Sequence, residues 1–453
     1  MVSPSSLSRI VKAYDVRGVV PDELDADIAH RLGRAAAIEL GAPEILVGRD
    51  MRVTSEELAA AVMRGVRAEG VATIDLGLAS TDLLYYASGR LERPGIMVTA
   101  SHNPARYNGL KLCRAGAVPV SFDTGLRRIR DRAATAAVDT PAGAGAHREL
   151  DMLAAYAEHV RSFIDPTVLR PLRVAVDAGN GMAGHVVPPV FTDLPVELVP
   201  LYFELDGTFP NHPASPIEPE NLRDLQALVR SASCDLGLAF DGDADRMFCV
   251  DGDGRPVSPS LVTAITAERM LARHPGAPVL YNLICSRIVP EAIRRAGGVP
   301  VRTRVGHSFI KSVMAETGAI FGGEHSGHYY FRDNFRADSG LIAAVILLEA
   351  LSAYGGTLAD MVAPYDAYVQ SGEINSEVAD ATAAVAAVAD AFADRGDADY
   401  ADGLTVSADA WWFNLRPSNT EPMLRLNVEA IDEETMATVC DEVLTLVRGT
   451  GRR

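Results

Sequence analysis

Cysteine is scarce in this sequence, and the five cysteines that occur form no recognisable framework. Their number is odd, and no two of them have the C-x-x-C spacing of redox motifs and zinc sites. This pattern predicts reduced thiols and argues against a disulfide scaffold or a cysteine-based zinc site. The cysteines are Cys113, Cys234, Cys249, Cys285 and Cys440.

A long apolar run is also missing. The most apolar stretch, residues 341–348, is far shorter than the roughly 20 residues that a membrane-spanning helix needs. Residues 1–18 contain no apolar segment of the kind found in a secretory signal. We therefore expect a cytoplasmic protein with no membrane partner.

Positive charge is in short supply, and lysine more so. Lys and Arg total 42 against 60 Asp and Glu, which gives a formal net charge of −18. This excess of acid argues against non-specific binding to nucleic acid, but a locally cationic cleft could still hold a small anion. The three lysines are Lys12, Lys111 and Lys311. Each lysine is either present by chance or stands where the planar guanidinium of Arg cannot replace a compact ammonium group.

What is present is an ordinary globular composition, with 48% apolar and 23% charged residues among 453. That length suggests two to four domains at roughly 100–200 residues each. Strand and helix signals alternate in the first third, where strands are expected over residues 44–48, 71–76 and 95–99. Thr54 to Glu57 reads as a capping box that starts a helix. This rhythm is typical of a mostly parallel sheet covered by helices.

The same rhythm restarts twice, and it changes near the end of the chain. Residues 133–146 are small and aperiodic and read as a linker. A second α/β segment follows, and a third begins near residue 254. From about residue 367 the pattern becomes a smaller α+β unit. We expect domains over residues 1–146, 147–253, 254–366 and 367–453.

The first chemistry-bearing motif is the hexapeptide TASHNP, residues 99–104. It follows a strand, where open α/β sheets place ligand-binding loops. Ser101 offers a hydroxyl beside the His102 imidazole, and Lys111 could supply positive charge or a proton. A serine hydroxyl is a weak nucleophile unless a base assists it or it is already phosphorylated. The alternative is an ordinary turn.

The second motif, DGDADR, places Asp241, Asp243 and Asp245 at alternate positions after an apolar strand. In an extended loop this alternation points all three carboxylates to one side. Such close like charges repel each other unless a cation neutralises them, and oxygen ligands favour Mg²⁺ or Ca²⁺ over zinc. The alternative, a solvated acidic turn, is disfavoured by the apolar strand and by Arg246, which follows at once.

Two further loops suit a phosphorylated sugar. GGEHSGH, residues 322–328, offers Glu324 and Ser326 for vicinal hydroxyls, although a glycine-rich turn with packed histidines would read the same. RPSNTEP, residues 416–422, combines the Arg416 guanidinium with hydroxyl and amide donors in an anion cradle. A capped surface turn is the alternative for that loop. Four loops from four segments fit one cleft that performs metal-assisted phosphoryl transfer.

With these motifs in this order, the sequence resembles the α-D-phosphohexomutases, most closely their bacterial phosphomannomutase/phosphoglucomutase branch. The spellings GEHSGH and SNTEP fit that branch better than the GEQSGH and SGTEP of glucosamine-phosphate mutases. The resemblance spans the whole chain. The matching motifs are KAYDVRG at 12–18, TASHNP at 99–104, NGLK at 108–111, DGDADR at 241–246, VGHSFIK at 305–311, GEHSGH at 323–328 and RPSNTEP at 416–422.

The resemblance implies four domains around a central cleft, three of them similar mixed α/β domains and the fourth a smaller α+β domain. It implies reversible interconversion of mannose or glucose 1-phosphate and 6-phosphate through an enzyme phosphoserine and a hexose 1,6-bisphosphate. The enzyme would depend on Mg²⁺ and be a monomer or homodimer. Another mutase of the superfamily, such as a phosphoglucosamine mutase, is the alternative.

The resemblance also assigns roles to residues. Ser101 is implied as the phosphoserine and as a metal ligand together with Asp241, Asp243 and Asp245. Arg246 is implied to lie beside the phosphoserine. Glu324 and Ser326 would bind the sugar O3 and O4. The implied ligands of the non-reacting phosphate are Arg416, Ser418, Asn419 and Thr420. Further cleft residues are Tyr14, Arg17, His102, Lys111 and His307. The last three are candidates for proton transfer or for stabilising charge in the transition state.

One position departs from the family pattern. Some members have a lysine where this chain has Ile284. Either Arg287 or Lys311 supplies that charge, or phosphate binding there is weaker.

Two other readings compete with a mutase. A metal-dependent sugar phosphatase with Asp241 as nucleophile would leave Ser101 and the anion loop unexplained. A non-catalytic sugar-phosphate sensor would be expected to have lost Ser101 or one of the aspartates.

Overall fold

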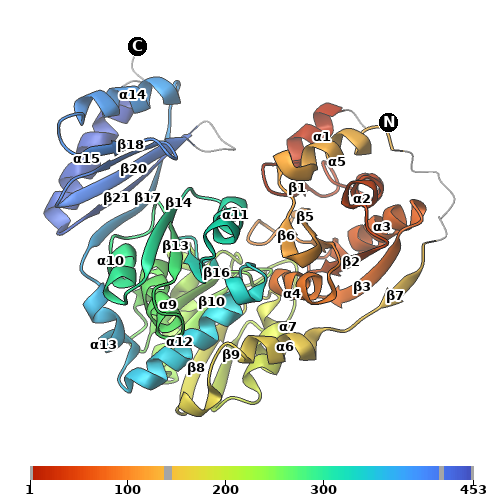
Figure 1. Cartoon of the computed structure of the whole chain (residues 1–453), viewed down its shortest axis with the longest axis horizontal. Helices are drawn as coiled ribbons and strands as arrows, with labels where there is room; N and C mark the ends of the chain where they lie inside the picture. Colours follow the sequence, from red (N-terminus) through yellow and green to blue (C-terminus); the bar gives the residue numbers. More distant parts are fainter. Residues whose placement is uncertain (1–3, 137–144, 418–422, 450–453) are drawn as a thin grey trace.

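The computed structural model describes residues 4–136, 145–417 and 423–449, and strand counts refer to these residues. The chain forms four sheets in succession, three of mixed α/β type and one antiparallel. Figure 1 shows the N-terminal unit at the right, the C-terminal unit at the left, and the second and third units between and below them. The predicted α/β architecture with three similar units and a smaller fourth is confirmed.

The first unit has a seven-stranded sheet of order β1-β5-β4-β2-β3-β7, with β6 paired to β5. Strands β2, β3, β4 and β7 run parallel, and β1, β5 and β6 are antiparallel to their neighbours. The elements are α1 (Pro4–Ile10), β1 (Val16–Val19), α2 (Ala26–Leu40), β2 (Glu44–Arg49), α3 (Ser55–Ala68), β3 (Ala72–Leu78), α4 (Thr81–Leu91), β4 (Gly95–Val98), β5 (Tyr107–Arg114), β6 (Val118–Pro119), α5 (Arg127–Ala133) and β7 (His147–Glu149).

The second unit has a five-stranded sheet of order β12-β11-β10-β8-β9, in which β9, β8 and β10 are parallel. Its elements are α6 (Leu153–Arg161), β8 (Leu172–Asp177), α7 (Ala183–Phe191), β9 (Val196–Leu201), α8 (Arg223–Ser231), β10 (Leu236–Phe240), β11 (Met247–Asp251) and β12 (Pro256–Val257).

The third unit has the order β14-β13-β15-β16, with only β16 antiparallel. Its elements are α9 (Pro259–Arg273), β13 (Pro278–Asn282), α10 (Ile288–Arg295), β14 (Val299–Thr303), α11 (His307–Thr317), β15 (Phe321–Gly323), β16 (Tyr329–Phe331), α12 (Gly340–Tyr354) and α13 (Leu358–Val362).

The fourth unit is an antiparallel sheet of order β17-β21-β20-β19-β18 with two helices. Its elements are β17 (Val369–Glu377), α14 (Ala381–Ala391), β18 (Asp397–Asp399), β19 (Leu404–Ser407), β20 (Trp411–Pro417), β21 (Met423–Ala430) and α15 (Glu433–Gly449).

The first three sheets share one local feature that positions the site. In each, a parallel strand leads through a loop into an antiparallel neighbour: β4 into β5, β10 into β11, and β15 into β16. These three loops carry TASHNP, DGDADR and GEHSGH. Loops at the carboxyl ends of parallel strands are where α/β sheets bind ligands. The three motifs therefore occupy equivalent places in three related sheets.

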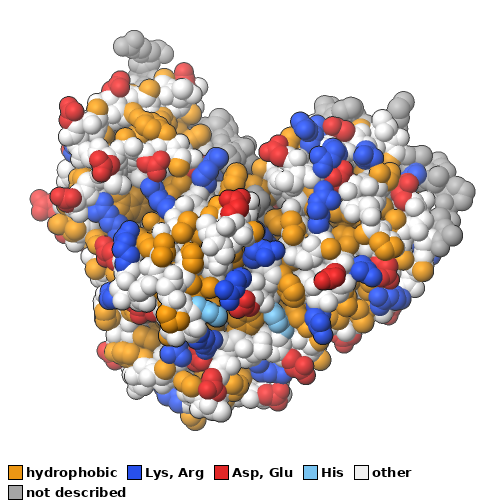
Figure 2. Space-filling model, in the orientation of Figure 1, with side chains coloured by type: hydrophobic (Ala, Val, Ile, Leu, Met, Phe, Trp, Pro, Cys, Tyr) orange, Lys and Arg blue, Asp and Glu red, His pale blue; other side chains and the backbone are white. Residues whose placement is uncertain are grey.

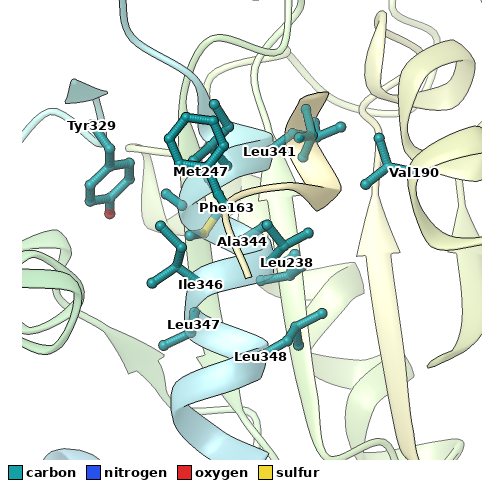
Figure 3. Packing of buried hydrophobic residues seen from close by; sticks show 14 of the residues in the cluster. Phe163, Val190, Leu238, Met247, Tyr329, Leu341, Ala344, Ile346, Leu347 and Leu348 are labelled. Atoms are coloured by element: carbon teal, nitrogen blue, oxygen red, sulfur yellow. The ribbon is translucent and has the colours of Figure 1, made fainter. Parts of the chain in front are cut away.

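A single hydrophobic core joins the first three units, whereas the fourth has its own. Helix α12 is buried on all sides, and its residues Leu341, Ala344 and Leu348 pack among Leu238 and Val190 of the second unit (Figure 3). The core of the fourth unit is confined to residues 384–447. The fourth unit therefore meets the others through its surface rather than through a shared core. This arrangement suits a domain that moves as a body.

One local expectation needs correction. Thr54 precedes α3, but its side chain makes no cap hydrogen bond; its Oγ1 instead accepts from Asn108 Nδ2 at 3.0 Å.

The first two sheets continue a few residues past the expected domain ends at residues 146 and 253. Strand β7 pairs with β3 of the first sheet, and β12 pairs with β11 of the second.

All five cysteines are buried and free. Among the described helices, no single one has the length and apolar composition to cross a membrane. Only a bent pair, Gly340–Tyr354 with Leu358–Tyr365, meets that test when taken together.

Candidate active site

Ser101 lies in the loop after β4 with a left-handed backbone, at φ 51°. Its hydroxyl donates to Asp241 Oδ2 at 2.6 Å and lies 3.2 Å from His102 Nδ1. The residue is only 1% exposed. A non-glycine residue in this backbone region is uncommon and must be held there by its surroundings.

Arg52, which follows β2, holds the Ser101 loop from behind. Its guanidinium donates to the carbonyl oxygens of Ser101 and Asn103 at 2.7 Å, and of Pro104 and Tyr107 at 3.0 and 2.9 Å. Asp50 pairs with this buried arginine at 3.3 Å. Five donors in a rigid fork allow one side chain to fix several carbonyls. No local sequence pattern predicts this role, because a buried arginine after a strand has no motif of its own.

Arg17 supports the same loop from the β1 side. Its guanidinium donates to the side chain of Asn103 and to the carbonyl of Ala100, and its Nε donates to Asp15 at 2.7 Å. Arg17 therefore holds the TASHNP loop at Ala100 and Asn103.

The three aspartates converge, although not in the predicted way. Residues 241–245 form a turn rather than an extended loop, with Ala244 at φ 61° and its N–H bonded to the Asp241 carbonyl at 3.1 Å. One carboxylate oxygen from each of Asp241, Asp243 and Asp245 lies within 4.8 Å of the others, and all three residues are buried. The three carboxylates therefore meet because the chain turns, and not because they alternate along an extended loop as expected.

This cluster fits a divalent cation. Burial, followed by the charges of Asp245 and Asp243, raises the pKa of Asp241 well above its ordinary value. Oδ1 of Asp243 and Oδ1 of Asp245 are buried without a hydrogen-bond partner in the described residues. Three carboxylates, two of which have a free oxygen, form the kind of donor set that Mg²⁺ or Ca²⁺ prefers. These residues could therefore hold such an ion beside the Ser101 hydroxyl.

Lys111 on β5 reaches the same carboxylates. Its Nζ lies 2.7 Å from Asp243 Oδ2 and 2.6 Å from Asp245 Oδ2. Burial lowers the pKa of the Lys111 ammonium, but the two carboxylates outweigh burial and the pKa is raised well above its ordinary value. Lys111 is thus a fixed positive charge in this arrangement. Thr81, at the start of α4, also donates to Asp243.

Arg246 joins the acidic loop to the third unit. Its Nε lies 3.6 Å from Asp241 Oδ2 and 3.2 Å from His328 Nε2, and Arg246 and His328 form an antiparallel bridge. The charge of Arg246, followed by burial, lowers the pKa of His102 well below its ordinary value. His102 is therefore a neutral imidazole near pH 7 and is able to accept a proton.

The GEHSGH loop holds its polar groups firmly. Glu324 accepts from Asn282 Nδ2 at 3.1 Å and from the Tyr330 hydroxyl at 2.8 Å, and burial raises the pKa of its carboxyl. Ser326 Oγ lies 2.9 Å from His328 Nδ1. His328 lay inside the motif but was not among the predicted site residues. Its position between Ser326 and Arg246 makes it part of this site.

The remaining predicted residues belong to the first, third and fourth units. Arg416, near the end of β20, pairs with Glu373 at 3.0 Å. Tyr14 packs edge-on against Phe309 of the third unit, with ring centroids 6.3 Å apart. Only the backbone of His307 is described, at the start of α11. Ser418, Asn419 and Thr420 lie outside the described residues. Figure 2 shows the molecule hollowed between the first and fourth units.

Arg287 and Lys311 are the candidate sources of the positive charge that Ile284 lacks. Both have partners within the protein. Arg287 donates to the carbonyls of Asp409 at 2.8 Å and Trp411 at 2.9 Å, and its backbone N–H donates to Glu429. Lys311 is buried in an ion pair with Asp338 at 2.7 Å. Arg287 thus joins the third unit to the fourth, whereas the Lys311 charge is paired within the third unit.

Comparison with known families gives a match along nearly the whole chain. Four models described as phosphoglucomutase/phosphomannomutase match in succession: α/β/α domain I over residues 8–138, α/β/α domain II over 154–254, α/β/α domain III over 258–368, and the C-terminal domain over 373–446.

Individual proteins agree. The chain is 43% identical over 444 residues to a protein of Xanthomonas campestris pv. campestris named phosphohexose mutases, covering 97% of this chain and 99% of that one. It is 41% identical over 448 residues to the phosphomannomutase of Salmonella montevideo, covering 96% and 98%. A crystal structure of a phosphoglucomutase/phosphomannomutase family protein from Burkholderia thailandensis matches with a TM-score of 0.90 and 33% identity, over 100% of this chain and 99% of that one.

Proposed function

The chain belongs to the phosphoglucomutase/phosphomannomutase family, and we propose that it interconverts the 1-phosphate and 6-phosphate of mannose and of glucose. The resemblance inferred from the motifs is confirmed by these matches. One observation supports the proposed chemistry most strongly: the Ser101 hydroxyl lies 2.6 Å from a carboxylate of a buried three-aspartate cluster. Phosphoryl transfer from a serine beside a divalent cation needs that juxtaposition.

The residues divide the work by their chemistry. Asp241, Asp243 and Asp245 would hold Mg²⁺, which when bound supplies positive charge against the charge of the transferring phosphoryl group. Arg246 and Lys111 are placed to add fixed positive charge on the same group. Glu324 and Ser326 would orient the sugar through its hydroxyls, as hydrogen-bond acceptor and donor.

The first transfer moves the phosphoryl group from Ser101 to the sugar. The bond between phosphorus and Ser101 Oγ breaks while a bond forms between phosphorus and the sugar hydroxyl oxygen. The hydroxyl proton passes to a base, for which the neutral His102 imidazole, 3.2 Å from Ser101 Oγ, is a candidate, and the Ser101 oxygen takes up a proton as it leaves phosphorus. The product of this step is a hexose 1,6-bisphosphate. The reverse transfer, from the other phosphate of that bisphosphate, restores the phosphoserine.

The bisphosphate must turn around between the two transfers without being lost or hydrolysed. Arg416, with Ser418, Asn419 and Thr420, would hold whichever phosphate is not reacting. The separate core of the fourth unit supports its movement as a body over the cleft. Mannose and glucose differ at C2, whereas the proposed contacts of Glu324 and Ser326 are to O3 and O4. We therefore include both sugars as substrates, with glucosamine phosphate as the alternative.

The test is a side-by-side assay of mannose 1-phosphate, glucose 1-phosphate and glucosamine 1-phosphate, with Mg²⁺ and a hexose 1,6-bisphosphate activator. We expect the 6-phosphates of mannose and glucose to form without net release of inorganic phosphate. Release of inorganic phosphate with no need for the bisphosphate would instead establish a phosphatase.

We also propose a location for the enzyme and a form in which it works. The five buried thiols support residence in the reducing cytoplasm. We propose that the enzyme works as a monomer or homodimer and acts on a small phosphosugar.

A further inference from the structure

Glu373 forms an ion pair with Arg416, the arginine that is proposed to bind the non-reacting phosphate. It lies on β17, and its two carboxylate oxygens are 3.0 Å from Arg416 Nη2 and 3.1 Å from Arg425 Nη1. Arg416 on β20 and Arg425 on β21 are directly opposite each other in the antiparallel register. One carboxylate is therefore flanked by two guanidinium groups at the end of the fourth sheet.

This group carries more positive than negative charge. Like charges directly opposite on neighbouring strands destabilise a sheet, so the Glu373 carboxylate stabilises the arginine pair as its counter-ion. Yet one carboxylate balances only one guanidinium. Nε of each arginine is also buried without a hydrogen-bond partner among the described residues. The group retains both charge and donors for a further anion.

We infer that Glu373 is a placeholder for the substrate phosphate, and this rests on the proposed phosphate-binding role of Arg416. In the empty cleft its carboxylate holds the Arg416 side chain in position. Carboxylate and phosphate oxygens bind a guanidinium in the same forked geometry, so the two anions compete for the same donors. In the loaded cleft the negative charge of Glu373 opposes the bound phosphate and favours its release.

Such competition has a use in the proposed reaction. The bisphosphate has to leave its first orientation and bind again in the opposite one within each cycle. An arginine that held the phosphate without opposition would slow that exchange, because binding the ground state more tightly does not raise turnover. Glu373 would weaken ground-state binding while keeping the empty site ordered.

The test is the substitution Glu373→Gln, with Glu377→Gln as the matched control. Glu377 is exposed on the same strand, and the described residues include no arginine paired with it. Binding of mannose 1-phosphate is measured calorimetrically in a Ser101→Ala background, where no phosphoryl group can be transferred. We expect Glu373→Gln to tighten binding by about three- to tenfold, the range for removing one screened like charge. In the otherwise native enzyme, KM and kcat should both fall.

Thermal unfolding without ligand separates this role from a structural one. Loss of the counter-ion should lower the unfolding temperature of Glu373→Gln even as its affinity rises, whereas damage to packing alone would lower both. The gain in affinity should also disappear in the double variant with Arg416→Ala.

Two results would overturn the inference. If Arg416→Ala weakens binding but Glu373→Gln leaves it unchanged or weaker, the placeholder role is wrong and the proposed function stands. If Arg416→Ala itself leaves binding of mannose 1-phosphate unchanged, the phosphate role of Arg416 fails, and the inference fails with it.

Discussion

Ser101 Oγ donates a 2.6 Å hydrogen bond to Asp241 Oδ2, although 140 positions separate the two residues along the chain. The contact exists because both loops follow a parallel strand at the equivalent place in their own sheets. It brings a hydroxyl to the edge of a buried carboxylate cluster, and so places the proposed phosphoryl acceptor beside the proposed cation site.

Replacing Asp243 by Asn should weaken Mg²⁺ binding roughly tenfold or more, the loss expected when a metal site is disturbed. Asp243 is one of the three clustered aspartates, and its carboxylate also accepts from Lys111 and Thr81. Turnover should be measured against Mg²⁺ concentration, and unfolding in EDTA. We expect the unfolding temperature in EDTA to be unchanged or higher, because one repelling charge is gone. Equal turnover of the native enzyme in EDTA and in Mg²⁺ would contradict the metal assignment.

Arg416→Ala should raise KM for mannose 1-phosphate and glucose 1-phosphate by similar factors. Loss of a charge-assisted hydrogen bond corresponds to about 1.5–3 kcal/mol, or roughly one to two decades in KM. The two sugars share the phosphate that Arg416 is proposed to bind, so steady-state kinetics should show no preference. A loss confined to one sugar would place Arg416 in sugar recognition instead.

Lys111→Arg should reduce turnover although the charge is kept. The Lys111 ammonium lies within 2.7 Å of two buried carboxylates, and the larger planar guanidinium does not fit that position. Lys12, which is exposed, provides the control, and Lys12→Arg should be close to silent. Both variants should be compared at saturating substrate and across pH. Native turnover and pH profile in Lys111→Arg would show that any cation suffices there.

Arg52→Lys should lower kcat roughly tenfold or more with a smaller change in KM. Lysine cannot bond all four carbonyls that Arg52 holds, so the Ser101 loop would lose its position, and small misplacements near a reacting group are costly. The exposed Arg106 in the same region gives the control substitution Arg106→Lys. Unchanged kcat in Arg52→Lys would mean that the loop is held by other contacts.

The sequence was informative where a motif follows a strand. The strands before TASHNP and DGDADR could be predicted from apolar residues that end in polar ones. The convergence of the aspartates could also be predicted, but not its cause. The turn depends on the left-handed conformation of Ala244, which the residue type does not predict, because alanine rarely adopts it.

Other features depend on partners distant in the sequence. Thr54 matches a capping box by its spacing, yet its hydroxyl oxygen accepts a hydrogen bond from Asn108 of β5 instead of capping the helix. Strand β7 joins the first sheet after a stretch that reads as a linker, because β3 offers a free edge. Arg52 and Glu373 acquire their roles only when strands far apart in the chain lie side by side. Such contacts are set by tertiary structure and leave no local pattern.

The most direct measurement is the intact mass of the purified enzyme after incubation with glucose 1,6-bisphosphate and Mg²⁺. We expect the native enzyme to gain the mass of one phosphoryl group, to lose it on addition of excess mannose 1-phosphate, and to form mannose 6-phosphate as it does so. The Ser101→Ala variant should gain no mass and have no mutase activity while its unfolding temperature stays near that of the native enzyme. A Ser101→Ala enzyme that interconverts the two mannose phosphates at the native rate would contradict the account.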